Sequence, residues 1–346
     1  MADNVLKSLN TALHRLLRED ARVMVLGEDL LDPYGGAFKV TKGLSEAFPN
    51  RVFTTPISES GFTGVAAGMA MRGLRPVVEI MFGDFLMLAA DQLLNYISKC
   101  RWMYNDRVSV PMVIRTPMGG RRGYGPTHSQ TIEKHFIGMP GLHVVAPSVF
   151  YDPGELLRQA VLQDDDPVLF VENKLLYARP VRDAVTGGRM GDLHARTTAG
   201  CYPTLTLSYA PFDHADVTLV AYGHMAELAE EAARELLMEQ EVYCELVILS
   251  QISPLNLTPT LESLTRTGHL VVCEEGTQTA GWAAEVIAQV ACAGFERLTL
   301  APKRVAARDL PIAGTESLER ATLPQVSDIV QAILSVVVDR PQHRMY

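Results

Sequence analysis

The chain has 346 residues, of which 47% are hydrophobic and 21% are charged, and this is typical of a globular protein with room for two domains. Its formal net charge of −9 argues against a nucleic-acid partner, because phosphate binding requires a basic face. No apolar run approaches the roughly 20 residues of a membrane span and no signal peptide is visible, so we expect a cytoplasmic protein that has no membrane partner.

The first half of the chain alternates apolar strands with helices, after an amphipathic helix within residues 1–20. Strands are expected at 23–26, 51–54, 76–82, 110–115, 142–146 and 168–172. Helices are expected at 40–48, 61–71, 85–99 and 153–162. Continuously apolar strands that are separated by helices predict a mainly parallel sheet covered on both faces.

The second half repeats this pattern after a stretch that is rich in Gly, Arg, Thr and Pro and has no clear period. Strands are expected at 217–221, 244–249, 269–273 and 298–300, with helices at 224–239, 258–267, 281–293 and 324–338. The fold class is therefore α/β, with two doubly wound domains. We expect the domains at residues 1–180 and 214–346, joined by an irregular crossover at 181–213.

Several common motifs are missing. The five cysteines are far apart, odd in number and without a Cys-x-x-Cys pair, which predicts reduced thiols and supports neither a disulfide framework nor a structural zinc site. There is no phosphate loop of the Gly-x-x-x-x-Gly-Lys-Ser/Thr type and no Gly-x-Ser-x-Gly nucleophile elbow. The sequence therefore gives no support to a P-loop nucleotidase or a serine hydrolase.

Glu59 is a lone carboxylate in an apolar stretch, between a predicted strand and a helix that is too apolar to face water. An ionised carboxylate is costly to bury there, so it should have a partner or an unusual protonation state. An ordinary reading is also open, in which Ser58 caps the helix and Glu59 interacts favourably with the helix dipole in the first turn.

Two more features follow the next strands. Met81, Phe82 and Phe85 lie at the end of the strand at 76–82, where they could line a planar ring or belong to the ordinary core. His128 follows a glycine-rich loop after the strand at 110–115, where it could act as an acid or base or be a structural histidine. Because open α/β sheets bind ligands at the carboxyl ends of their strands, Glu59, Phe85 and His128 are expected at one edge.

These residues belong to an ordered series of motifs that covers nearly the whole chain. The series comprises Val25-Leu26-Gly27-Glu28-Asp29, Tyr34-Gly35-Gly36-Ala37-Phe38, Thr55-Pro56-Ile57-Ser58-Glu59-Ser60-Gly61, Gly73-Leu74-Arg75-Pro76-Val77-Val78-Glu79, Asp91-Gln92, Arg115-Thr116-Pro117, His128-Ser129-Gln130, Pro140-Gly141-Leu142, Asp166-Pro167-Val168, Glu172-Asn173-Lys174, Asp216-Val217-Thr218-Leu219-Val220 and Glu274-Glu275-Gly276. In this order they resemble the beta subunit of the thiamine-diphosphate-dependent 2-oxo acid dehydrogenases. The resemblance implies a transketolase-like pyrimidine-binding domain followed by a transketolase C-terminal-like domain.

The resemblance also assigns roles to residues. It implies that Glu59 hydrogen-bonds the aminopyrimidine ring of thiamine diphosphate and favours its imino form, so that the cofactor's own amine can remove the thiazolium proton. Phe85 would pack against the pyrimidine, with Ile57 and Met81 nearby. His128 would face the reacting carbon as a proton-transfer or stabilising group.

The family's diphosphate motif, Gly-Asp-Gly followed some two dozen residues later by Asn, is absent from this chain. Mg²⁺ requires hard oxygen ligands and the diphosphate itself, so no metal ligand is assigned here. The resemblance therefore implies an alpha subunit that brings the motif, Mg²⁺ and the diphosphate half of the site, in an α₂β₂ assembly.

The activity that the resemblance implies is oxidative decarboxylation of a 2-oxo acid, with acyl transfer to a lipoyl group on an acyltransferase core. Two alternatives stay open at this point. One is a two-subunit transketolase or acyloin-forming carboligase, and the other is a non-catalytic structural subunit that has kept the fold.

Overall fold

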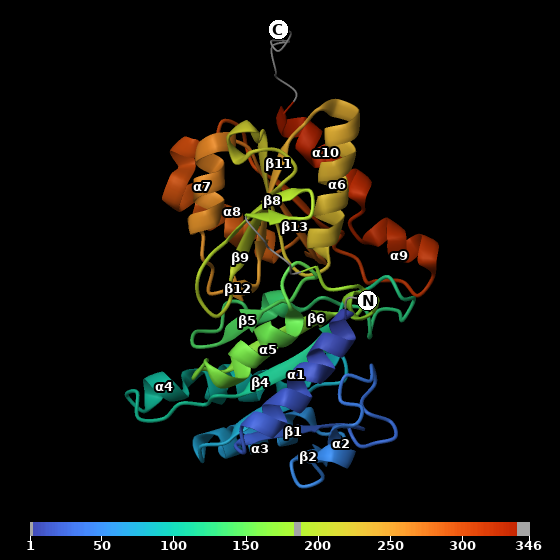
Figure 1. Cartoon of the computed structure of the whole chain (residues 1–346), viewed down its shortest axis with the longest axis vertical. Helices are drawn as coiled ribbons and strands as arrows, with labels where there is room; N and C mark the ends of the chain where they lie inside the picture. Colours follow the sequence, from blue (N-terminus) through green and yellow to red (C-terminus); the bar gives the residue numbers. More distant parts are fainter. Residues whose placement is uncertain (1–2, 183–187, 338–346) are drawn as a thin grey trace. The chain divides into compact units, whose positions relative to one another are not determined.

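The computed structural model describes residues 3–182 and 188–337 (Figure 1). Its first compact unit contains the described residues up to 182 together with 200–202 and 251–254, and its second contains the others. The ends of the predicted domains, at residues 1–2 and 338–346, and residues 183–187 of the predicted crossover lie outside the described residues. Within the described ranges, no helix is both long and apolar enough to cross a membrane.

The first unit is built around a seven-stranded sheet, counted over the described residues. Its strands are β1 (Val23–Gly27), β2 (Val52–Thr54), β3 (Arg75–Glu79), β4 (Val113–Met118), β5 (His143–Val145), β6 (Val168–Asn173) and β12 (Gln251–Ser253). The order is β12-β5-β6-β4-β3-β1-β2, and every neighbouring pair is parallel except β12 with β5. The predicted mainly parallel sheet is confirmed.

Helices cover this sheet as their apolar faces require. Helix α1 (Val5–Glu19) begins at Asn4, whose side chain accepts a hydrogen bond from the Lys7 N–H at 2.8 Å, and its buried face packs against α5 (Pro153–Leu162; Figure 1). Helix α3 (Glu59–Met71) packs against β1 and β3.

The helix predicted at 85–99 is present but is not a regular α-helix, whereas most of the helix predicted at 40–48 is absent. Residues 85–99 form a 3₁₀ turn η1 (Gly83–Ala89), a π turn η2 (Gln92–Tyr96) and a second 3₁₀ turn η3 (Ile97–Lys99), followed by α4 (Cys100–Met103). The chain is pinned at the start of η1, where a Cβ on Gly83 would lie 2.3 Å from the Met118 side chain. Of 40–48, only α2 (Leu44–Ala47) is helical, because Gly43 begins it with a φ of +82°.

The second unit carries another seven-stranded sheet within the described residues. Its strands are β7 (Arg189–Met190), β8 (Leu193–Thr197), β9 (Thr204–Ser208), β10 (Val217–Ala221), β11 (Cys244–Leu249), β13 (Leu270–Thr277) and β14 (Lys303–Ala307). Its helices are α6 (Met225–Gln240), α7 (Thr258–Thr267), α8 (Trp282–Gly294), α9 (Glu316–Thr322) and α10 (Val326–Val337). The order is β14-β13-β10-β11-β9-β8-β7, parallel from β14 to β11 and antiparallel beyond.

Two parts of the second unit differ from the sequence prediction. The stretch expected to be an irregular crossover contributes β7, β8 and β9, which extend the sheet as an antiparallel meander. These strands are stabilised by pairing at the edge of the sheet rather than by a long apolar run, so their composition does not mark them. The strand expected at 298–300 is absent, because the Thr299 N–H bonds to the Gly268 carbonyl in a loop and β14 begins at Lys303.

A buried ion network joins the central strands of the first sheet. The Arg115 guanidinium on β4 makes two hydrogen bonds with the Glu172 carboxylate on β6, at 2.8 and 2.7 Å, and a third with Glu79 on β3 at 2.6 Å. The Tyr177 hydroxyl donates to Glu172 at 2.7 Å. Burial raises the pKa of Glu79 even though the opposing charge of Arg115 lowers it.

Replacing Arg115 should therefore destabilise the fold strongly. Arg115→Met leaves two buried carboxylates without a cation, and we expect a loss of about 3–5 kcal/mol in the free energy of unfolding. Arg15→Met removes an exposed ion pair with Glu19 and should change stability by less than about 1 kcal/mol. Urea denaturation of the full chain, followed by circular dichroism, measures both. Equal midpoints for the two variants would contradict this reading of the network.

Candidate active site

The strand order of the first sheet creates a crevice at its carboxyl edge. The chain passes from β1 to β2 on one side and then returns across β1 to β3 on the other, so the order reverses between β1 and β3. Ligands of open α/β sheets bind at such a reversal. Glu28 follows β1, Glu59 follows β2, Phe82 and Phe85 follow β3, and His128 lies in the loop after β4.

Glu59 is the first residue of α3, and its side chain is buried, with 4% exposure. Within the described residues, its carboxylate has no hydrogen-bond donor, and Ser58 makes no side-chain capping bond. Ser58 therefore occupies the N-cap position without the expected side-chain bond, and Glu59 lies in the first turn. A buried carboxylate without a protein donor can accept a hydrogen bond from a ligand.

Glu28 is a second buried carboxylate next to Glu59, with 8% exposure. Burial raises the pKa of Glu28, and the charges of Glu59 and Asp29 raise it further. Its Oε1 atom has no hydrogen-bond partner within the described residues. Glu28 was assigned no role from the sequence, although it directly follows β1 at the sheet edge where Glu59 was expected.

The aromatic side of the crevice is centred on Phe82. The His128 imidazole stands edge-on to Phe82, with ring centroids 4.8 Å apart, and to Phe85 at 5.3 Å. Phe82 also contacts the rings of Phe38 at 5.6 Å and Tyr124 at 6.2 Å. The structure therefore brings the predicted Phe85 and His128 together. Phe82, which the sequence left open as ordinary core, is their common neighbour.

The other two predicted binding residues have different surroundings. Met81 is half-buried between the end of β3 and η1. Ile57 is 85% exposed in the link between β2 and α3. A large apolar side chain that is exposed beside a buried carboxylate indicates a surface that another molecule covers.

His128 belongs to a loop over residues 119–131, which follows β4. The loop is tied to η1 by Gln130, whose side-chain amide donates to the Asp84 carboxylate at 2.8 Å. The Thr127 hydroxyl lies 3.0 Å from Nδ1 of His128. Arg121 has a φ of +66°, and Arg122 is exposed above the Phe38 and Tyr124 rings.

The crevice residues fit an aromatic nitrogen heterocycle. An unpaired carboxylate at Glu59 can bind a ring nitrogen, and the phenylalanine rings offer a flat apolar face. Among the described residues, the crevice does not assemble the three or more carboxylates or histidines that would hold a metal ion. A magnesium diphosphate group would need ligands from outside this unit.

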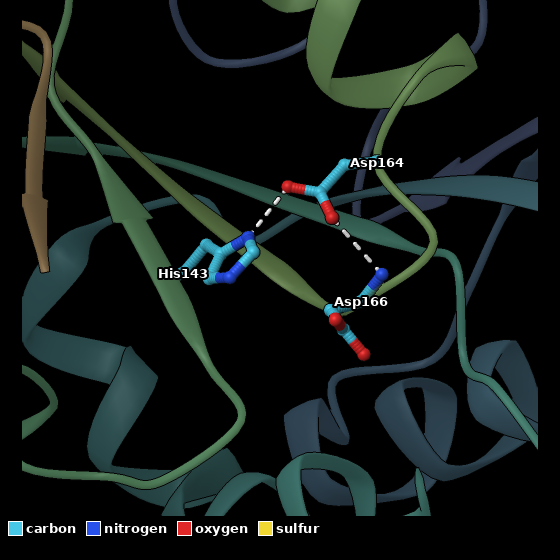
Figure 2. Close-up of side chains that lie close together, drawn as sticks. All are labelled: His143, Asp164 and Asp166. Carbon is cyan, nitrogen blue, oxygen red and sulfur yellow. Dashed lines mark hydrogen bonds and ion pairs between the residues drawn. The ribbon is translucent and has the colours of Figure 1, made fainter. Parts of the chain in front are cut away.

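A cluster of possible metal ligands lies elsewhere in the first unit, around His143, Asp164 and Asp166 (Figure 2). Their ligand atoms are within 4.8 Å of one another. However, Nδ1 of His143 lies 2.6 Å from the Asp164 carboxylate, which also accepts from Tyr202 at 2.7 Å, and Asp166 accepts from Arg101 at 2.6 Å. These bonds already balance the carboxylates, so the cluster is a structural network.

The network should make stability depend on pH. The hydrogen bond to Asp164 raises the pKa of His143. Burial raises the pKa of Asp164. The hydrogen bonds with His143, Asp166 and Tyr202 lower it by more, so the pKa lies below the usual value. The His143 contribution is complete below its unfolded pKa of about 6.5 and is lost as pH rises through the higher folded value, while that of Asp164 is lost in acid.

We therefore expect His143→Gln to destabilise the chain by on the order of 1 kcal/mol at pH 6 and by much less at pH 9. His135→Gln serves as the control, because partial desolvation of the ring and the charge of Lys134 lower the pKa of His135, so its contribution should not be lost as pH rises. Thermal or urea denaturation at the two pH values measures the difference. A His143→Gln effect that is independent of pH would refute the charged pair.

Comparison with known proteins identifies the fold class. A model of the transketolase pyrimidine-binding domain matches residues 4–180, and a model of the transketolase C-terminal domain matches residues 211–329. A solved structure described as a split-gene transketolase, an inactive beta4 tetramer, has a TM-score of 0.75 over 97% of this chain and 99% of its own at 23% identity, which shows the same fold. The fold and crevice therefore define a two-domain protein of the transketolase type.

Full-length relatives narrow the class to a family. The mitochondrial pyruvate dehydrogenase E1 beta-1 subunit of Arabidopsis thaliana is 38% identical over 94% of this chain and 86% of its own. The E1 beta subunit of Rickettsia bellii is 35% identical over 97% and 99%, and the acetoin:2,6-dichlorophenolindophenol oxidoreductase beta subunit of Cupriavidus necator is 35% identical over 94% of both chains. The chain belongs to this family of E1-type beta subunits of thiamine-diphosphate-dependent enzymes.

Proposed function

We propose that the chain is the beta subunit of a thiamine-diphosphate-dependent 2-oxo acid dehydrogenase and supplies the pyrimidine-binding half of its active site. The observation that carries the proposal is the buried Glu59 carboxylate, which has no donor among the described residues and lies at the strand-order reversal of a sheet of this family. A second subunit with its own phosphate-binding loop would complete the site.

When bound, thiamine diphosphate supplies a nucleophilic carbon and an electron sink for decarboxylation of a 2-oxo acid. Glu59 would accept a hydrogen bond from the pyrimidine ring and so favour its imino form. Phe85 and Met81 would hold the flat face of the ring, and Ile57 would lie at its edge. His128 moves a proton or stabilises charge at the substrate, since its imidazole faces the same crevice as the phenylalanine rings.

The missing half of the site belongs to an alpha subunit in this proposal. It would carry the Gly-Asp-Gly…Asn motif, bind Mg²⁺ and the diphosphate, and form an α₂β₂ tetramer with the cofactor between alpha and beta chains. The acyl group would then pass to a lipoyl arm. The relatives named as beta subunits support a multisubunit enzyme.

An uncovered apolar face beside Glu59 supports a partner at this place. Helix α3 exposes Gly61, Val65 and Gly68 at helical spacing, and small residues allow another helix to approach closely. Next to them lies a cavity of about 530 Å³. It is lined by Leu26, Phe53, Thr55, Pro56, Ser58, Gly61, Phe62, Val65 and Met69. Apolar surface of this kind is typical of a subunit interface.

A second candidate function keeps the cofactor and changes the reaction. The Cupriavidus necator relative is named for acetoin and is as similar to this chain as the Rickettsia bellii relative. Acetoin is an acyloin, so this likeness favours a carboligase or acyloin-cleaving enzyme as the alternative to a 2-oxo acid dehydrogenase. A panel of 2-oxo acids, acetoin and aldehyde acceptors, with and without lipoamide, separates the two.

A non-catalytic subunit would show no thiamine diphosphate uptake in calorimetry, even with the alpha partner.

Glu59→Gln tests the proposed role directly. We expect the variant, assembled with the alpha subunit, to lose decarboxylation by about a hundredfold or more, because a neutral amide does not favour the imino form. Glu155→Gln is the matched control, since Glu155 also lies in a first helical turn but on α5. Carbon dioxide release from the 2-oxo acid is the measurement. Full activity of Glu59→Gln would refute the mechanism.

Val65→Arg tests the partner surface. The change places a charge on the exposed face of α3, and we expect it to abolish co-purification with the alpha subunit. Leu318→Arg on α9 is the control, because both side chains are 60% exposed but Leu318 lies in the second unit. Size-exclusion chromatography of the mixed subunits measures assembly. Normal assembly of Val65→Arg would place the partner elsewhere.

A further inference from the structure

Lys174 is a buried cation at the same sheet edge as the candidate site. It directly follows β6, and its N–H donates to the Met118 carbonyl at the end of β4, at 3.0 Å. The residue is only 1% exposed. An ammonium group is costly to remove from water, so the contacts that it makes inside the protein are expected to have a specific purpose.

The ammonium group reaches the residues of the crevice. Nζ of Lys174 donates a short hydrogen bond to the backbone carbonyl of His128. It also lies 5.4 Å from the centroid of the Phe82 ring and 5.6 Å from that of Tyr124, within the range of cation–π attraction. One side chain on the end of β6 thus connects the loop after β4 with the turn after β3.

The loop that carries His128 needs such contacts. Residues 119–131 form neither helix nor strand, so no ladder of regular hydrogen bonds holds their backbone. Gly119, Gly123 and Gly125 have φ values of +94°, +68° and +77°, which only glycine adopts easily. Two backbone bonds within the loop are long, from the Gly119 N–H to the Gln130 carbonyl at 3.3 Å and from the His128 N–H to the Gly125 carbonyl at 3.4 Å, so side-chain contacts add to its anchoring.

We propose that Lys174 is the positioning residue of His128. Its bond ends on the backbone carbonyl of His128, so it holds the backbone of this residue without contacting either ring nitrogen, and Nδ1 lies near the Thr127 hydroxyl. Its attraction to Phe82 holds the same ammonium against the ring on which the imidazole rests. This inference rests on the proposed role of His128, and it adds a residue that acts through that histidine and not on the substrate.

Hydrogen–deuterium exchange of the full chain, assembled with its alpha subunit, measures how well the backbone of residues 119–131 is protected and needs no activity assay. In Lys174→Met, we expect exchange of peptides from residues 119–131 to rise by about tenfold or more, while peptides from β4 exchange as in the parent protein. Lys174→Arg keeps the charge and donor and should restore most of the protection. Lys174→Gln, which keeps a shorter uncharged donor, tests the same point if the Met variant does not fold.

A double-mutant cycle then connects the loop to catalysis. We expect Lys174→Met to lower kcat about tenfold or more with KM for the 2-oxo acid nearly unchanged, and to have no further effect when His128 is already Ala. Unchanged exchange of the loop would overturn the proposal, and so would an equal loss of kcat in the His128→Ala background. If the parent complex does not decarboxylate any 2-oxo acid, the proposed function fails, and the exchange result still decides the role of Lys174.

Discussion

The site depends on the bonds that one buried guanidinium makes with two buried carboxylates. Arg115 on β4 bonds to Glu79 on β3 and Glu172 on β6, and so fixes how these three neighbouring strands are aligned along one another. The residues that follow these three ends carry the aromatic turn, the His128 loop and Lys174. A buried ion network of this type contributes little net stability but makes misalignment costly, which suits a strand edge that must hold side chains in place.

The crevice combines buried carboxylates and exposed apolar side chains, which is unusual for a protein that works as a monomer. Glu28 and Glu59 are buried side by side without enough donors, and Ile57 and Val65 are exposed next to them. Each feature is unfavourable for the isolated chain. On the proposed function, both would become favourable when a cofactor ring donates to the carboxylate and a second subunit covers the apolar surface. This chain would then supply one half of the active site, and the second subunit would supply the other.

Much of this arrangement could be predicted from the sequence. The strands at 217–221 and 244–249 are marked by continuous apolar runs and the helix at 153–162 by its helical period, and Glu59, Phe85 and His128 follow predicted strands in order. The irregular geometry of the helix at 85–99 could not be predicted, because the close packing of Gly83 against the Met118 side chain leaves no periodic pattern. The strands β7 to β9 could not be predicted either, because their pairing at the sheet edge leaves no such pattern. The link between Lys174 and His128 joins residues 46 positions apart, and only the fold brings them together.

The most direct test of the account is the exchange of the thiazolium C2 proton of thiamine diphosphate in the assembled enzyme, followed by quenched-flow NMR. This rate reports whether the protein favours the imino form before any substrate binds. The account predicts rapid exchange with the parent chain and an exchange rate that falls by about a hundredfold or more with Glu59→Gln. Equally rapid exchange with both chains would contradict the claim that the buried Glu59 carboxylate activates the cofactor.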